Sequence, residues 1–344
     1  MEAAVHTALA QESGGWLRRH LPGLLTVVMV ALAATFLSEH YGGPQLLYAL
    51  LFGMALNFLA DTPATKAGIA FASRAVLRTG VALLGARITL SQVEATGWRT
   101  ATLVVVAVIA TIGFGAWLGR RLQGSTAVGV LTGGAVAICG ASAALALASV
   151  LPRDERVQRF TLLTVVGVTV LSTVCMIVYP MLTQLAGLDA TSTGIFLGAT
   201  IHDVAQVVGA GYMVSPQAGD TATLVKLLRV AMLLPVVAVV AMCFRRQAAG
   251  RAGQAPSIVP WFLVAFAALM LLSSTDVVPQ AATDAMNHAS RWCLVIAIAA
   301  LGTKTSIQQL AQLGWRPVAL VVLNTLFLAA LVTAGIWFLN GPAA

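Results

Sequence analysis

The chain has 344 residues, of which 59% are hydrophobic and only 9% are charged. A soluble domain carries about 25% charged residues, and the mean hydropathy here is +0.90, so composition excludes a soluble protein. The apolar runs are long and continuous, which argues against a transmembrane β-barrel. The net charge of +8 lies in short basic clusters between these runs, a pattern typical of membrane topology and not of nucleic-acid binding.

The apolar segments predict an all-α polytopic membrane protein. Residues 1–21 are too polar for a signal peptide, and we expect a cytoplasmic or interfacial segment there. About 20 apolar residues span a bilayer as a helix, and we expect a single transmembrane domain over residues 22–339. Its eleven expected segments are 22–38, 44–60, 69–90, 100–118, 126–150, 160–183, 191–213, 222–244, 258–274, 289–303 and 317–339.

Basic residues in short loops predict the orientation of the chain. If every segment crosses, one side receives Arg18, Arg19, Lys66, Arg120, Arg121, Arg245, Arg246 and Arg251. That side would be cytoplasmic, with the N-terminus inside and the C-terminus outside. The basic loop 152–159 disagrees, because it would lie outside. A re-entrant segment 126–150 would move this loop to the inside.

An internal repeat joins two distant parts of the chain. Residues 72–99 and 289–316 align without a gap at a constant offset of 217, with eleven identities in 28 positions. The repeated hairpins with their following helices cover 72–109 and 289–326. The copies start seven segments apart, so they should have opposite orientations, as in the inverted repeats of secondary transporters. The alternative is two similar hairpins that serve packing alone.

Segment 126–150 is rich in small residues, with four glycines and Ser142 close to Gly140. Small residues allow close packing between membrane helices. Glycines also weaken a helix, so the segment can equally be a discontinuous helix. In that case its freed N–H groups and positive end would face an anion at mid-membrane.

Ionisable residues interrupt the next two segments. His202 and Asp203 lie side by side in segment 191–213, and Gln206 shares their helical face. Such residues inside membrane spans are costly and usually functional. They can couple transport to protons, or His202 and Gln206 can contact a substrate while Asp203 pairs with a cation. The alternative is a polar pair that only holds helices together.

Lys226 and Arg229 lie one helical turn apart in segment 222–244. Two neighbouring cations suit a compact oxyanion, because a guanidinium can bind two oxygens at once. Lys226 can instead extend to the membrane interface, and Arg229 can instead pair with Asp203. Arg87 and Lys304 occupy equivalent positions in the repeat, and we expect them at opposite membrane faces in structural roles.

The sequence contains no motif typical of an enzyme. P-loop, HExxH and GxSxG patterns are absent, so we expect neither catalysis nor ATP hydrolysis, and no cofactor. The four cysteines stand alone, which favours packing over metal binding or disulfides.

Five motifs in this order resemble the YeiH-like sulfate exporter family of bacterial inner-membrane proteins: ALLGARITL…GWR, GGAVAICGASAALA, GATIHDVAQVVGAG, KLLRVAMLLP and ALGTKTSI…GWR. The resemblance covers about residues 22–339. It implies a fold similar to sodium/proton antiporters and bile-acid symporters, with broken crossing helices in a core domain. The second domain in such folds is a panel that forms a homodimer.

The expected function is therefore export of a sulfite- or sulfate-like oxyanion by an elevator-type secondary transporter, with H⁺ or Na⁺ coupling. Asp203 and His202 are the expected coupling residues. The substrate-binding residues would be Cys139, Gly140, Ser142, His202, Gln206, Lys226 and Arg229. The alternatives are a cation/proton antiporter that uses Asp203 as its carrier, and a non-transporting membrane sensor or scaffold.

Overall fold

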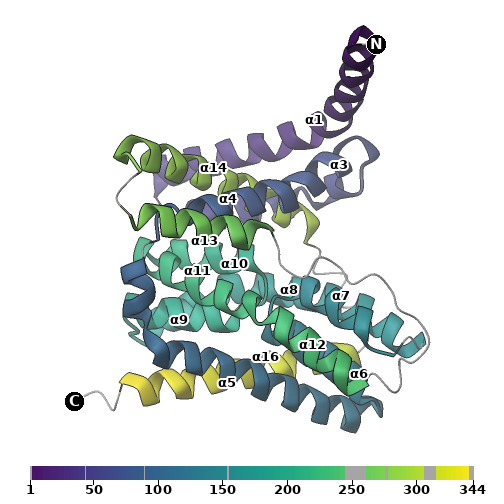
Figure 1. The fold of residues 1–344 in the computed structure, drawn as a ribbon, viewed down its shortest axis with the longest axis vertical. Coiled ribbons are helices and arrows are strands. Elements are labelled where there is room, and N and C mark those ends of the chain that lie inside the picture. Colours follow the sequence, from purple (N-terminus) through teal and green to yellow (C-terminus); the bar gives the residue numbers. More distant parts are fainter. Residues whose placement is uncertain are drawn as a thin grey trace.

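The computed structural model describes residues 2–42, 44–88, 90–152, 155–244, 261–275, 278–305 and 315–340. Within these ranges the regular structure is helical, and six helices are long and apolar enough to span a membrane. The all-α membrane fold expected from composition is confirmed. The first helix, α1 (Glu2–Tyr41), contains Pro22, and its N-terminal part bends away from the rest of the molecule (Figure 1). The segment of α1 that is apolar enough to span a membrane is Gly15–Tyr41.

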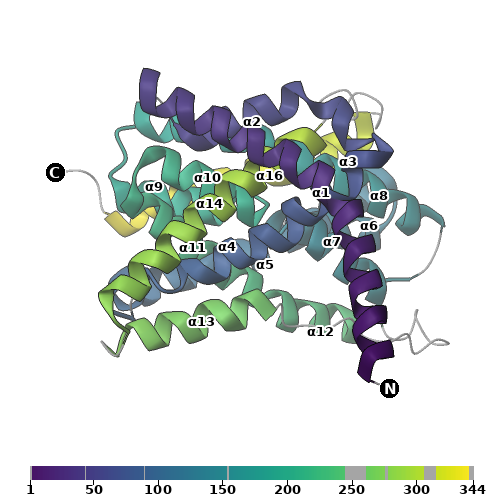
Figure 2. The same cartoon turned by 90° about the horizontal axis from the view of Figure 1, so that it is seen from above.

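The helices form two layers (Figure 1). The panel layer contains α1, α2 (Gln45–Ala55), a 3₁₀ turn (Asn57–Ala60), α3 (Pro63–Phe71), a π-helical turn (Ala72–Val76), α4 (Leu77–Leu84), α13 (Trp261–Ser273) and α14 (Gln280–Lys304). Figure 2 shows this layer face-on, with α1, α4, α13 and α14 running across the front.

The core layer contains the central helices and the last one. These are α5 (Leu90–Gln123, interrupted by a kink at Gly97), α6 (Thr126–Ala137), α7 (Ala141–Val150), α8 (Glu155–Leu185), α9 (Ala190–Thr200), α10 (Val204–Val214), α11 (Pro216–Ala231), α12 (Leu233–Phe244) and α16 (Trp315–Asn340). Helix α10 contacts both α2 and α14 and so joins the layers.

The internal repeat is visible in the helix boundaries. Pro63 at the start of α3 and Gln280 at the start of α14 are separated by the same 217 residues as the sequence match, and so are Gln123 and Asn340 at the ends of α5 and α16. In Figure 1 the α3–α4 pair runs in the opposite direction to α14, and α5 runs opposite to α16. The two copies therefore have inverted orientations.

The repeat also extends to α2 and α13, where the sequences no longer match. A side chain at Gly85 would clash with the carbonyl of Phe266 on α13, and one at Gly302 would clash with the carbonyl of Leu50 on α2. Leu50 and Phe266 correspond under the repeat offset to within one residue. Each copy thus uses its glycine to admit the backbone of an equivalent helix.

Segment 126–150 is a helical hairpin that turns back. Arg156, in the first turn of α8, donates a hydrogen bond of 2.8 Å to the carbonyl of Gln123 at the end of α5. The start and the end of the segment therefore lie at the same end of the molecule. Leu147 on α7 packs against Gly134 on α6, as two antiparallel arms require. Of the alternatives left open by the sequence, the structure has the broken, re-entrant one.

Segment 191–213 is a second hairpin, although its apolar length predicts a full crossing. Gln217 at the start of α11 donates a hydrogen bond of 3.0 Å to Thr191 at the start of α9. Gly211, near the end of α10, also lies against this part of α11, at Gly219, so the start and the end of the segment lie side by side. An arm of 11 residues is about 16 Å long, which is about half the thickness of a bilayer core. The expectation of a full crossing is therefore corrected for this segment.

Because the first hairpin turns back, the basic loop 152–159 lies at the same end of the molecule as the other basic loops. Arg156 and Arg159 now lie beside Arg316 and Gln123, around one shared depression. Arg120 and Arg121 lie in the last turn of α5 at the same end. These five basic residues therefore gather at one end of the molecule, in agreement with the positive-inside pattern. Arg153, Arg245, Arg246 and Arg251 lie outside the described residues.

Candidate functional site

The tips of the two hairpins meet in the middle of the core layer. Residues 138–140 separate α6 from α7, and residues 201–203 separate α9 from α10. Gly140 turns the first tip with a φ of 64°. A Cβ at Gly140 would lie 3.6 Å from the Cβ of His202 on the second tip. The structure thus brings the two glycine-rich segments together at the positions where their helices are interrupted.

A single ammonium group bridges the tips. The Nζ of Lys226 donates hydrogen bonds to the carbonyls of Ile138 at 2.7 Å and Ile201 at 2.9 Å. Lys226 is fully buried, so its side chain does not extend to the interface. The carbonyls at the end of a helix have no partner within it, and this lysine supplies one for each hairpin.

Arg229 binds carbonyls of the same two helix ends. Its guanidinium donates to the carbonyls of Val136 and Ala137 at 2.7 Å each, at the end of α6. It also donates to Gly198 and Ile201 at 3.0 Å each, at the end of α9. Helix C-termini carry a partial negative charge, which explains two buried cations at this place.

These contacts change the expected roles of the two cations. A guanidinium has five N–H donors and an ammonium has three, and most of them are used by the carbonyls. No ion pair joins Arg229 to Asp203 among the described residues. The geometry assigns both cations to the helix ends, and direct contact of either with a substrate stays a prediction.

The positive ends of the other two half-helices differ from each other. Asp203 caps α10, since its Oδ1 accepts a hydrogen bond of 3.0 Å from the N–H of Ala205. Its own N–H donates to Ser172 of α8 at 3.1 Å. The first N–H groups of α7 receive no side-chain cap. Ser142, in this turn, is exposed and donates to the carbonyl of Cys139 at 3.3 Å.

Two buried polar atoms at the tips have no partner. The Nε2 of His202 is paired with Thr325 of α16 at 2.8 Å, and the amide nitrogen of Gln206 donates to Thr173 of α8 at 2.8 Å. The Nδ1 of His202 and the Oε1 of Gln206 are buried, and no described residue hydrogen-bonds to them. Unpaired buried polar atoms are costly and rare, so these two atoms point to a bound water or substrate.

Three supporting residues were missed by the sequence analysis. Ser172, Thr173 and Thr325 fix the backbone or side chains of the second tip. Hydroxyls are common in membrane helices because they bond to their own backbone, as Thr325 does to Val321. The positions of these hydroxyl residues in the sequence therefore do not indicate that they support the site. Thr173 also approaches Thr305, directly after α14, at 3.5 Å, which connects the site to the panel layer.

Comparison with known proteins places the chain in a family. The family model described as "Conserved hypothetical protein 698" matches residues 22–321. The chain belongs to the UPF0324 membrane protein family. It is 51% identical to UPF0324 membrane protein CT0845 of Chlorobaculum tepidum, over 94% of this chain and 90% of the relative. It is 50% identical to UPF0324 membrane protein TauZ of Paracoccus pantotrophus, over 95% and 98%. No solved structure matches the chain.

The equivalent cations of the repeat lie apart in this UPF0324 protein. Arg87 follows α4 and forms an ion pair of 3.1 Å with Asp220 of α11. Lys304 ends α14, and its Nζ lies 3.4 Å from the hydroxyl of Ser73. Because α4 and α14 run in opposite directions (Figure 1), the two cations lie toward opposite ends of the panel layer. Arg87 additionally joins the panel to the core.

Proposed function

We propose that this UPF0324 protein is a secondary transporter for a small oxyanion of the sulfite or sulfate class, and that it exports this ion across the bacterial inner membrane. The observation that carries the proposal is the balance of charge at the hairpin tips. Two negative helix ends are matched by Lys226 and Arg229. Two positive helix ends are matched by one carboxylate, that of Asp203.

This balance leaves the site short of negative charge. A helix end carries about half an elementary charge, so the two cations more than neutralise the ends of α6 and α9. Asp203 offsets part of the excess at α10, and α7 has no carboxylate at its start. In a low-dielectric interior such an excess is costly, and a bound anion would remove it.

The proposed substrate position lies between the start of α7 and the second tip. The N–H groups after Gly140 and the buried atoms of His202 and Gln206 would contact the ion, with Cys139 and Ser142 beside it. Lys226 and Arg229 would act through their charge. The single proton of the Thr325 hydroxyl is donated to the carbonyl of Val321, so the Nε2 of a neutral His202 donates to that hydroxyl and its Nδ1 accepts. Nδ1 would then take a hydrogen bond from the proton of a hydrogensulfite or hydrogensulfate ion.

The two layers suggest how access would alternate. Both hairpins belong to the core layer, while the panel layer contacts it through α10. We propose that the core carries the substrate past the panel in an elevator-type movement, that the basic end of the molecule is cytoplasmic, and that the panel forms a homodimer. Asp203 and His202 are the proposed sites of H⁺ or Na⁺ coupling.

Flux in proteoliposomes tests the proposal. Purified protein should move sulfite or sulfate, and the Gln206→Ala variant should lose most of this flux. Gln184→Ala, at an exposed position near the end of α8, is the matched control and should transport normally. If the unsubstituted protein moves none of a panel of small oxyanions, with or without a proton gradient, the proposal is wrong.

One observation favours a second candidate function. Asp203 is a carboxylate in the half-helix break, close enough to Lys226 to interact electrostatically. A cation/proton antiporter would use Asp203 as its carrier. In that case Asp203→Asn would abolish proton-driven cation flux and leave anion binding unchanged. An oxyanion transporter would instead show altered oxyanion flux in the same variant.

A further inference from the structure

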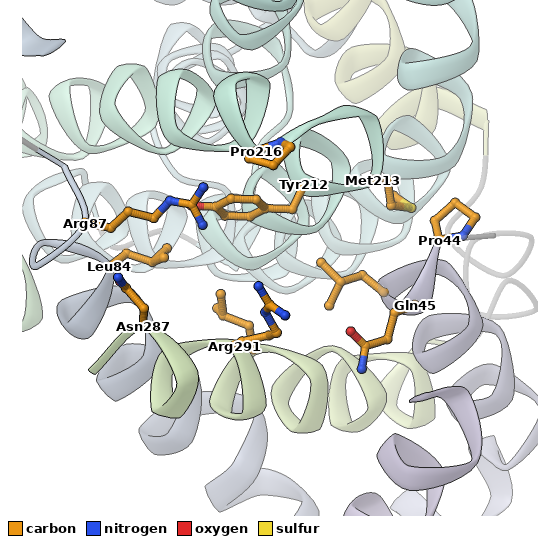
Figure 3. A pocket seen from close by; sticks show the side chains of 11 residues that line it. Pro44, Gln45, Leu84, Arg87, Tyr212, Met213, Pro216, Asn287 and Arg291 are labelled. Carbon is orange, nitrogen blue, oxygen red and sulfur yellow. The ribbon is translucent and has the colours of Figure 1, made fainter. Parts of the chain in front are cut away.

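A cavity of about 240 Å³ lies between the two layers, away from the hairpin tips. Figure 3 shows its lining side chains. Arg87 enters it from the end of α4, Asn287 and Arg291 enter from α14, and Gln45 and Tyr212 come from α2 and α10. A space of this size holds several water molecules. It lies at the end of the molecule opposite the basic loops, where α10 meets α11.

The two arginines of the cavity differ in their partners. Arg87 pairs with Asp220 and lies 5.5 Å from the ring centroid of Tyr212, whose hydroxyl also donates to Asp220 at 2.5 Å. Its charge is therefore matched. Arg291 is exposed, and its guanidinium has no ion pair or hydrogen bond within the described part of the chain. The cavity thus carries one unmatched positive charge.

A neutral polar group lies beside the unmatched charge. Asn287 is one helical turn before Arg291, on the same face of α14. Its Oδ1 is buried, and no described residue hydrogen-bonds to it. An amide can rotate to present its NH₂ group instead. A guanidinium and an amide that face one cavity form a donor set for a small oxyanion, to which arginine binds through two parallel bonds.

The internal repeat places the same charges at the other end of the panel. The offset of 217 relates Arg74 to Arg291 and Arg87 to Lys304. Lys304 and Arg74 also lie close enough to interact electrostatically. Each end of the panel therefore has a pair of cations, one from each copy of the repeat. Two hairpins that served packing alone would not require a pair of cations at each end of the panel.

We propose that the cavity between α2, α4, α10 and α14 is a second anion site, which binds a small oxyanion through Arg291 with Asn287 beside it. Asp220 competes with the anion for Arg87. The site is distinct from the hairpin tips, and its occupation does not depend on the transport proposed for them.

Protection from an arginine reagent tests this site. Purified, delipidated protein in detergent is treated with phenylglyoxal, in sodium sulfate or in sodium chloride of equal ionic strength, and modified peptides are quantified by mass spectrometry. Sulfate at twice its dissociation constant should slow the modification of Arg291 about threefold. Arg78, an exposed arginine on α4 outside the cavity lining, is the control and should react equally in both salts.

Substitutions around the cavity should change the protection of Arg291 by sulfate in opposite directions. Asp220→Asn should strengthen protection by sulfate, because it releases Arg87, and Arg87→Gln should weaken it. Gln206→Ala should leave protection unchanged while it reduces oxyanion flux, which separates this site from the proposed transport site.

Three outcomes would overturn the inference. One is equal slowing at Arg291 and Arg78, and another is loss of protection in Gln206→Ala. The third is protection by vesicles of phosphatidylglycerol but not by sulfate, which would make the cavity a lipid headgroup contact.

Discussion

The Nζ of Lys226 lies 2.7 Å from the carbonyl oxygen of Ile138, at the tip of the first hairpin, and donates a hydrogen bond to it. The same nitrogen also binds the second tip. Lys226→Met should therefore remove two charged hydrogen bonds and leave the carbonyl of Ile138 without a partner, while Arg229 still binds the carbonyl of Ile201. Hydrogen bonds to charged groups contribute about 1.5–3 kcal/mol each, so we expect clearly lower thermal stability in detergent. Lys304→Met, a partly buried lysine of the panel, is the control and should have a much smaller effect.

Arg229 binds carbonyls of both hairpins through three different nitrogens. Arg229→Lys keeps the charge but not the planar fork, whereas Arg229→Ala loses both. If the charge attracts the substrate, sulfite affinity should fall much more in the alanine variant than in the lysine variant. Equilibrium binding to purified protein measures this difference. Equal affinity in all three proteins would limit Arg229 to a structural role.

Gly140 has a positive φ, and a Cβ added there would contact His202 and Val168 at 3.6 Å each. Gly140→Ala puts a side chain on a backbone with φ 64° and ψ −123°, which costs about 1–3 kcal/mol, and places a methyl group beside the proposed substrate position. Gly187 also has a positive φ, of 66°, and open space around it, so Gly187→Ala imposes backbone strain away from the site. We expect flux to fall only in the first variant. An equal loss in both would attribute the effect to backbone strain.

Thr325 positions the imidazole of His202 through a 2.8 Å hydrogen bond. Thr325→Val removes the hydroxyl at nearly constant volume, so the ring should lose its fixed orientation and substrate affinity should fall. The control is Thr333→Val on the same helix, where an exposed hydroxyl bonds only to its own backbone. Concentration-dependent flux compares the two. Normal affinity in Thr325→Val would remove His202 from the substrate contacts.

The return of the first hairpin predicts membrane topology. Arg156 lies at the end of the molecule that contains Arg121, and Gln217 lies at the opposite end. In a background without native cysteines, Arg121→Cys and Arg156→Cys should react with an impermeant thiol reagent from the same side, and Gln217→Cys from the other. Labelling of Arg156→Cys and Arg121→Cys from opposite sides would contradict the re-entrant geometry.

Much of this arrangement could be predicted from residue patterns. The inverted copies follow from identities such as Ser73 with Ser290, and the glycines near Gly140 were equally consistent with a break and with close helix packing. The direction of each hairpin could not be predicted, because a helix that crosses and two arms that return have the same apolar length. Nor could the partners of Lys226, since carbonyls occur at every residue and only tertiary packing selects Ile138 and Ile201.

The extension of the repeat to α2 and α13 could not be detected from the sequence either. Close backbone packing requires glycine at Gly85 and Gly302. The helices that pack there need only be apolar and expose their backbone at the point of contact. Many sequences satisfy that condition, so the two helices have diverged beyond alignment while their packing positions have not.

The shared ammonium of Lys226 also restricts how the molecule can change shape. Any motion that parts the hairpin tips must break the hydrogen bonds of Lys226 to at least one of them, in a buried and water-poor interior. A motion that keeps the tips together costs none of these bonds. The tips should therefore behave as one rigid piece, with the flexibility of the protein placed at the surface where α10 meets α2 and α14.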